Sequence, residues 1–255
     1  AGCGKQNDTN QTDKLSIVTT IFPEYDWVRE ILGDKADNAE ITMLLDNGVD
    51  LHSYQPTADD IVKISDCDLF IYVGGESDEW VEDALRNAAN RNMKVINLLE
   101  VLGDSVKTEE IVEGMQEEEH EHEDVEEHEH EDAEEREHEE EADEHVWLSL
   151  KNAKMLVRVI SKALQELDPN NKDIYAANAD AYVKKLSALD AEYQAAVDAA
   201  CNKTILFGDR FPFRYLVDDY GLHYYAAFVG CSAETEAGFE TISFLAKRVD
   251  EWKLP

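Results

Sequence analysis

The sequence predicts an α/β fold, and three observations support this. Short apolar, β-branched runs alternate with amphipathic segments through the first hundred residues. A long acidic run then interrupts the pattern, and two long helical segments follow it. After these helices, strand-like and helix-like segments alternate again. Strands separated by helices are typical of parallel sheets, in which binding sites lie beyond the carboxyl ends of the strands.

The first α/β unit contains four expected strands with helices between them. An N-cap residue, Thr57, is followed three positions later by Asp60, which predicts a capping box and therefore a helix start. Gly33 is expected to close the first helix. The expected strands span 15–21, 39–45, 69–73 and 94–98, and the expected helices span 25–32, 57–64 and 80–90.

The second half begins with two helices, at 150–167 and 172–200, separated by Asp168 and Pro169. A strand over 204–207, a turn at Gly208, a helix near 215–217, a strand over 223–228 and a helix over 239–252 are expected next. Two strands are too few for an independent sheet. We therefore expect an incomplete C-terminal lobe.

Residues 116–145 form an acidic, histidine-rich segment. It holds 19 acidic residues and one arginine, and so carries −18 of the formal net charge of −35. A solvated acidic spacer is one interpretation, since no apolar residue recurs in the segment. Six of the eight histidines also lie here, and imidazole together with carboxylate favours zinc. Besides His145, we expect weaker metal sites at His120, His122, His128, His130 and His138.

The remaining composition excludes several classes of protein. Outside the acidic segment the chain is still negative, which argues against a nucleic-acid partner. No apolar stretch approaches the roughly 20 residues of a membrane helix. Ala1-Gly2-Cys3 is similar to the end of a bacterial lipobox, so Cys3 is the expected site of lipid attachment. Residues 1–13 would then form a lipoprotein tether, although a chance cysteine is the alternative.

Three further cysteines have no obvious chemical role. Cys67 precedes an apolar strand and is expected to be a small buried residue. Cys201 and Cys231 could form a disulfide outside the cytosol, but the sequence leaves this open. The absence of a Cys-x-x-Cys spacing argues against a thiolate zinc site.

Two histidine motifs carry a family resemblance. Residues 48–59, Gly-Val-Asp-Leu-His-Ser-Tyr-Gln-Pro-Thr-Ala-Asp, and residues 143–153, Asp-Glu-His-Val-Trp-Leu-Ser-Leu-Lys-Asn-Ala, resemble the metal-ligand motifs of zinc and manganese substrate-binding proteins of ABC importers. The opening at 17–25 and the acidic loop before the second motif are similar to the zinc-specific branch. The resemblance implies two α/β lobes with mainly parallel sheets, joined by one long rigid helix, with a metal in the cleft between them. It implies His52 and His145 as ligands.

The implied domain organisation follows the same resemblance. The N-terminal lobe would span 14–147, including the acidic loop over 116–144. The linking helix would span 148–168, and the incomplete C-terminal lobe 169–255.

The third ligand position departs from that family pattern. Asp209 stands where the family usually has a histidine. A carboxylate can replace imidazole, and it would move the preference toward manganese. Asp209 could instead cap a helix or pair with Arg210 or Arg214. The fourth family ligand would lie beyond residue 255.

We therefore expect an extracytoplasmic, lipid-anchored, monomeric bacterial protein that captures Zn²⁺, with Mn²⁺ as a second option, and delivers it to an ABC permease without catalysis. Because histidine binds metal only when it is neutral, affinity should fall as the pH drops through roughly 6.5. One alternative is a zinc-dependent hydrolase, although no His-Glu-x-x-His motif is present. Another is a metal-buffering surface adhesin of the same fold.

Overall fold

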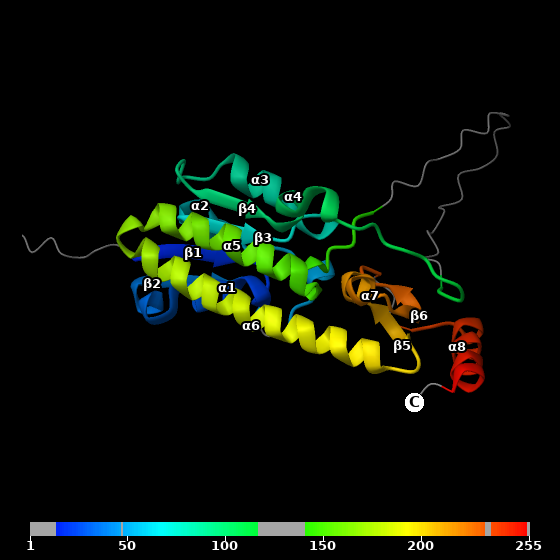
Figure 1. Cartoon of the computed structure of the whole chain (residues 1–255). Helices are drawn as coiled ribbons and strands as arrows, with labels where there is room; N and C mark the ends of the chain where they lie inside the picture. Colours follow the sequence, from blue (N-terminus) through cyan, green and yellow to red (C-terminus); the bar gives the residue numbers. More distant parts are fainter. Residues whose placement is uncertain (1–13, 47, 117–140, 233–235, 254–255) are drawn as a thin grey trace, which may run out of the picture.

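The computed structural model describes residues 14–46, 48–116, 141–232 and 236–253, which form two α/β lobes (Figure 1). The first lobe is built on a parallel four-stranded sheet in the order β2-β1-β3-β4. Its strands are β1 Leu15–Thr19, β2 Ala39–Met43, β3 Leu69–Tyr72 and β4 Lys94–Asn97. Its helices are α1 Phe22–Leu32, α2 Ala58–Asp66, α3 Trp80–Arg86 and α4 Leu98–Leu102.

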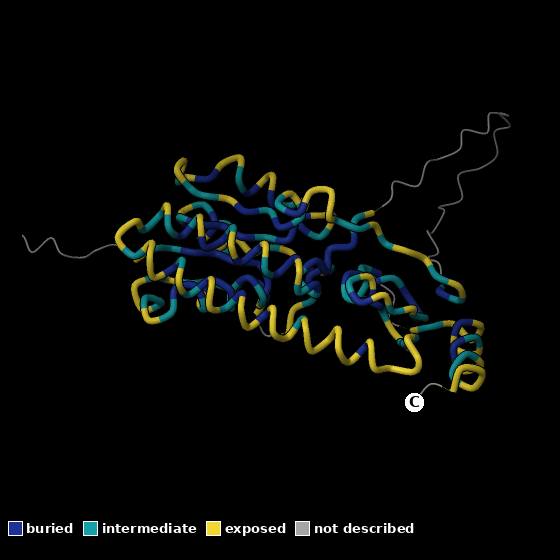
Figure 2. The backbone as a smooth tube through the Cα atoms, in the orientation of Figure 1, coloured by how far each residue is buried: buried dark blue, intermediate teal, exposed yellow. Residues whose placement is uncertain are grey.

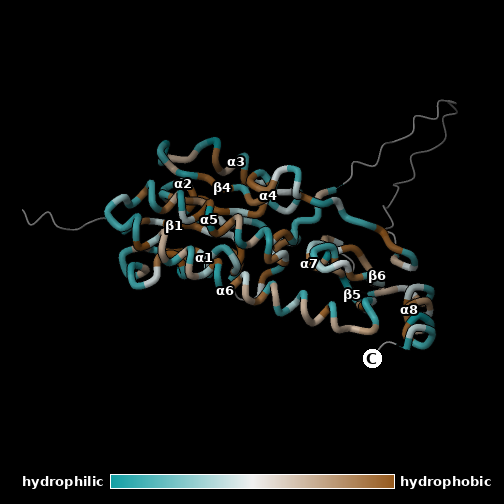
Figure 3. Tube along the Cα trace, in the orientation of Figure 1, coloured by the Kyte–Doolittle hydropathy of each residue, from teal (hydrophilic) through white to brown (hydrophobic). Residues whose placement is uncertain are grey.

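The core of the first lobe follows from its apolar strands. Ile17, Val18 and the β3 residues Leu69, Phe70 and Ile71 have at most 1% of their surface exposed. In a strand that is buried on both faces, apolar residues follow one another without interruption in the sequence. This is the pattern of β3. Along the helices, hydrophobic residues recur among hydrophilic ones (Figure 3), which is the pattern of helices with one apolar face.

The local signals of helix ends are confirmed in α2. Thr57 accepts a hydrogen bond from the backbone N–H of Asp60, and the Asp60 carboxylate accepts one in return from the N–H of Thr57. This capping box satisfies N–H groups that a helix start leaves without partners. Gly33 ends α1, as expected, with a positive φ of 53°.

Two long helices follow, α5 Leu150–Leu167 and α6 Lys172–Ala199. We expected the link between the lobes over 148–168, but the buried face of α5 belongs to the first-lobe core. The helix that runs from the first lobe to the second is α6 (Figure 1). Its 28 residues include no proline or glycine, and it is mostly exposed toward its C-terminal end (Figure 2).

The second lobe holds a parallel pair, β5 Thr204–Phe211 and β6 His223–Val229, connected by α7 Arg214–Tyr220. The helix α8 Phe239–Trp252 packs against both strands. The expected turn at Gly208 is wrong, because β5 continues to Phe211 through a shift in register between Phe207 and Arg210. Such a bulge adds residues to a strand and re-aims its side chains without ending it.

No helix in the described ranges is both long and apolar enough to span a membrane. Tyr215 of α7 is buried in the core of the first lobe, so the two lobes share packing. Its hydroxyl also accepts a hydrogen bond from the N–H of Lys107 at 3.0 Å and donates one to the carbonyl of Asp143 at 2.7 Å. The second lobe is therefore held next to the loop that carries His145.

Candidate metal site

The first predicted ligand, His52, lies in a single 3₁₀ turn, Leu51–Ser53, in the loop that follows β2. The carboxylate of Asp50 caps this turn by accepting the N–H of His52 at 3.0 Å. Burial alone would raise the pKa of Asp50, but this hydrogen bond and the guanidinium of Arg210 lower it below its usual value. Asp50 is therefore an anion that fixes the direction of the His52 backbone.

The second predicted ligand, His145, lies just before the turn Val146–Leu148 that leads into α5. It is buried, with 7% of its surface exposed. Asp143 accepts the backbone N–H of His145 at 2.8 Å, and the same oxygen lies 3.1 Å from Nδ1 of the imidazole. One carboxylate thus orients both the backbone and the ring.

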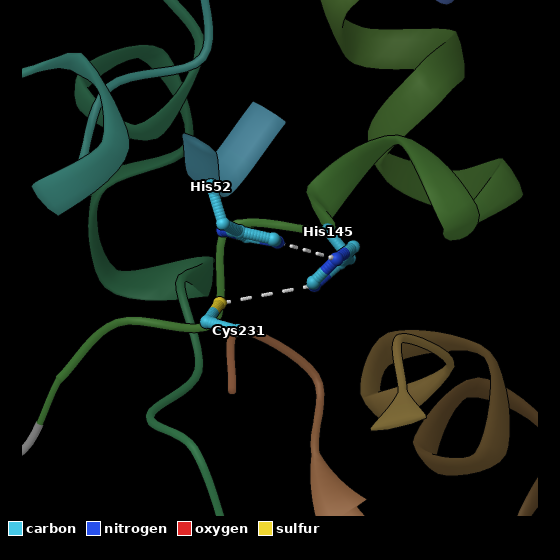
Figure 4. Close-up of side chains that lie close together, drawn as sticks. All are labelled: His52, His145 and Cys231. Atoms are coloured by element: carbon cyan, nitrogen blue, oxygen red, sulfur yellow. Dashed lines mark hydrogen bonds between the residues drawn. The ribbon is translucent and has the colours of Figure 1, made fainter. Parts of the chain in front are cut away.

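The two imidazoles face each other through their Nε2 atoms, which are 3.3 Å apart (Figure 4). Their Nδ1 atoms point toward oxygen: that of His145 toward Asp143, and that of His52 toward Ser77 Oγ at 2.9 Å and Glu144 Oε2 at 3.4 Å. Burial would raise the pKa of Glu144, but hydrogen bonds from His52 and Ser77 lower it. Anionic oxygens behind both rings favour a proton on each Nδ1 and leave both Nε2 lone pairs facing each other.

The separation of the two Nε2 atoms has a specific chemical meaning. Two nitrogens about 2.0–2.1 Å from one tetrahedral zinc ion lie about 3.3–3.4 Å apart. Two lone pairs at this distance repel each other unless a proton or a cation lies between them. The arrangement of His52 and His145 therefore fits a shared metal ion.

Cys231 is the third residue of the cluster, and sequence reasoning missed it. Among the described residues, His52, His145 and Cys231 form a group whose ligand atoms all lie within 4.8 Å of one another. The Sγ atom of Cys231 is 4.0 Å from Nδ1 of His145 (Figure 4). Burial, followed by the negative charge of Glu109, raises the pKa of the Cys231 thiol. The free protein therefore holds this group as a thiol.

A cavity of about 440 Å³ opens beside the two imidazoles. Its lining includes Asp209, the predicted third ligand, which the structure places outside the group of three. Asp209 is exposed, and its Oδ1 accepts the backbone N–H of the adjacent Arg210 at 2.8 Å. The remaining lining residues are Asp50, Leu51, His52, His145, Trp147, Leu148, Arg210, Pro212 and Gly230.

Arg210 connects the two lobes at the edge of this cavity. Its Nη2 donates to Asp50 Oδ2 at 2.9 Å, and its Nη1 donates to the carbonyl of Ser232 at 3.4 Å. Asp50 caps the turn of His52, and Ser232 follows Cys231. One guanidinium thus ties together the two loops that carry candidate ligands.

The other predicted site residues have different outcomes. Cys67 is fully buried, as expected. Cys201 and Cys231 are both free thiols. The loop histidines His120, His122, His128, His130 and His138 and the proposed lipid site Cys3 lie outside the described residues.

Comparison with known proteins identifies the family. Residues 17–255 match the family described as "Zinc-uptake complex component A periplasmic". The chain belongs to this family. It is 32% identical over 248 residues to "Zinc-binding lipoprotein AdcA" of Streptococcus pneumoniae, a match that covers 97% of this chain and 45% of that protein. It is 34% identical over 226 residues to "High-affinity zinc uptake system protein ZnuA" of Bacillus subtilis, covering 87% of this chain and 65% of that protein.

The fold of this zinc-uptake family member agrees with solved structures. The zinc-bound ZnuA-like domain of Streptococcus pneumoniae AdcA aligns with a TM-score of 0.68 and 29% identity, covering 94% of this chain and 76% of that one. The metal-dependent lipoprotein YcdH from Bacillus subtilis aligns with a TM-score of 0.71 and 26% identity, covering 94% of this chain and 77% of that one. The two-lobed α/β architecture expected from the sequence is therefore confirmed. The chain spans 45% of the length of AdcA and 65% of the length of ZnuA, the curated relatives it matches.

Proposed function

We propose that this chain captures a zinc ion outside the cytoplasm and hands it to the permease of an ABC importer. The observation that carries the proposal is the pair of Nε2 atoms, 3.3 Å apart, with carboxylates behind both rings. Membership of the zinc-uptake family and likeness to proteins named as zinc-binding lipoproteins support it. Anchoring through a lipid on Cys3 and a monomeric state belong to the same proposal.

In this proposal, capture changes only the ligands of the zinc ion. Water leaves the ion, and Nε2 of His52 and Nε2 of His145 replace it. Asp143 lies at Nδ1 of His145, and Ser77 together with Glu144 lies at Nδ1 of His52. These contacts orient the rings and raise their basicity as ligands. The second lobe offers two candidates for a third donor: Asp209, which lines the cavity, and Cys231, which belongs to the group of three potential ligands.

The double substitution of His52→Ala and His145→Ala tests the site. We expect zinc affinity to fall on the order of a hundredfold or more. Mutating even a residue that only hydrogen bonds to a metal ligand typically lowers metal affinity about 10–100-fold. Affinity is measured by competition with a chromophoric chelator, using the full chain stripped of metal.

The matched control is His223→Ala. His223 is exposed at the start of β6 and lines a different cavity. It should leave the tight site unchanged. Parent-like zinc affinity in the double variant would place the primary site elsewhere.

A further inference from the structure

We infer that Cys231 supplies the third ligand from the second lobe, as a thiolate, and that this makes the site selective for zinc over manganese. The inference rests on the proposed function, because it needs His52 and His145 to hold the same ion. It assigns a role to a cysteine that has no partner cysteine nearby in sequence and is a free thiol in the structure.

The geometry of the cluster is the first support. The Cys231 sulfur and one nitrogen of each imidazole lie within 4.8 Å of one another. Ligands at about 2.3 Å for sulfur and 2.0–2.1 Å for nitrogen on a tetrahedral zinc lie about 3.6 Å apart. The sulfur is 4.0 Å from Nδ1 of His145, so joining an ion held at the two Nε2 atoms requires the Cys231 side chain to move toward them.

The loop that carries Cys231 is built to approach His145 closely. Gly230 lies against the imidazole, and a Cβ at this position would be 3.0 Å from both Nδ1 and Cε1 of His145. The N–H of Cys231 donates to Glu109 Oε1 at 2.8 Å, which fixes the backbone at the sulfur-bearing residue. The position of the thiol is thus set by contacts on both sides of it.

Asp209 is the competing candidate, and its contacts favour Cys231. The Asp209 carboxylate is exposed and accepts the N–H of Arg210 within its own strand. It belongs to no group of potential ligands within 4.8 Å among the described residues, whereas Cys231 does. Asp209 lies in the irregular stretch of β5 between Phe207 and Arg210, whereas the sulfur of Cys231 is 4.0 Å from the imidazole of His145.

The chemistry of the thiol decides the metal preference. On binding, the S–H bond breaks, a metal–sulfur bond forms, and the proton passes to solvent; no electron is transferred. Thiolate is a soft ligand that suits zinc and cadmium, whereas manganese prefers carboxylate and water. A ligand set of two imidazoles and one thiolate therefore discriminates against manganese more strongly than two imidazoles and one carboxylate.

X-ray absorption on the zinc-loaded parent chain tests the ligand directly and needs no variant. We expect one sulfur at about 2.3 Å in addition to nitrogen at about 2.0–2.1 Å. A shell of nitrogen and oxygen alone would overturn the inference while leaving the proposed function intact. A spectrum with no nitrogen ligand on the zinc would contradict both.

Cobalt substitution assigns the sulfur to a residue. Co²⁺ added to the parent under reducing conditions should give visible d–d bands and a near-ultraviolet sulfur-to-cobalt charge-transfer band. Cys231→Ser should abolish the charge-transfer band and retain the d–d bands, while the exposed control Cys201→Ser keeps both. A band that survives Cys231→Ser, or disappears in Cys201→Ser, would overturn the assignment.

Metal competition tests selectivity. The ratio of zinc to manganese affinity should fall by roughly tenfold or more in Cys231→Asp, because the carboxylate suits the harder ion. Asp209→Ala reports the competing assignment: a larger loss of zinc affinity there than in Cys231→Ser would make Asp209 the ligand and refute Cys231. Double substitution of His52 and His145 to Ala distinguishes the two failures. A sulfur-to-cobalt band that persists without both imidazoles would refute the shared site on which the proposed function rests, whereas d–d bands alone can come from the loop histidines.

Discussion

At the scale of single residues, nearby carboxylates set the orientation of the two candidate imidazoles. His52 and His145 each lie in a short motif whose neighbours, Asp50 and Asp143, hydrogen bond to them within two positions. Cys231 could not be predicted in this way. Its distance from His145 depends on where β6 ends relative to the first lobe, and no spacing along the chain records that.

Asp78 provides a prediction at the same scale. Its side chain is buried, with 3% exposed, and Oδ2 accepts the N–H of Gly74 at 2.9 Å. Burial raises the pKa of Asp78 to about 6, and the negative charge of Glu144 adds to the shift. The group also helps to raise the pKa of buried Glu24 well above its usual value.

The sign of the effect on stability follows from linkage. Between the unfolded pKa of about 3.9 and the folded pKa, the native chain binds more protons than the unfolded chain, so stability falls as pH rises. Asp78→Asn removes this dependence. The unfolding free energy of the variant minus that of the parent should increase by about 2–3 kcal/mol from pH 4 to pH 7. Both are measured by urea unfolding with chelator present. A difference that stays constant with pH would contradict the shift.

At the scale of elements, alternating apolar runs predicted most helices and strands. The apolar pattern of a buried face and the residues that end a helix can both be seen in a short stretch of sequence. The structure differs in two places for tertiary reasons. Gly208 suggested a turn, but pairing with β6 keeps β5 extended through a bulge. We expected the link over 148–168, but α5 packs against the first-lobe core. Periodicity along the chain shows that α5 has an apolar face, but it does not show which core that face joins.

The exposed half of α6 gives a prediction about the link between the lobes. Ala191→Gly together with Ala195→Gly lies in the exposed stretch and should lower the unfolding free energy by about 0.8–1 kcal/mol per substitution. Looser positioning of the second lobe should also weaken zinc binding severalfold, because ordering the ligands then costs more.

The matched pair, Ala177→Gly with Ala181→Gly, is exposed on the same helix, in its N-terminal half. It should cost similar stability and leave zinc affinity unchanged. Calorimetric titration and thermal unfolding of both pairs provide the comparison. Equal effects of the two pairs on zinc affinity would show that α6 does not set the geometry between the lobes.

At the scale of the whole molecule, the described residues bring His52, His145 and Cys231 together without residues 117–140. The strand-like segments on its two sides pair with each other, through Glu109 N to Glu141 O at 2.9 Å and Asp143 N to Lys107 O at 2.8 Å. Gln116 donates its N–H to the carbonyl of Ala227 in β6 at 2.9 Å. Both ends of the loop are thus anchored beside the cleft.

Replacing residues 117–140 with a short Gly/Ser linker should therefore leave the tight zinc site within about twofold of the parent, because flexible linkers of different length differ little in closure free energy. The weaker binding that we assign to His120, His122, His128, His130 and His138 should disappear. Isothermal titration calorimetry separates the two classes. Loss of the tight class would place the primary metal in the loop.

The position of the cluster between the lobes has one more consequence. An ion held by His145 and Cys231 joins points 86 residues apart in the chain, and so acts as a reversible cross-link. A ligand that binds only the native state stabilises it, by about 4 kcal/mol when free metal exceeds the dissociation constant a thousandfold. The metal-free chain would lack this cross-link and open more often, so we expect an added protease to cleave it faster than the zinc-loaded chain.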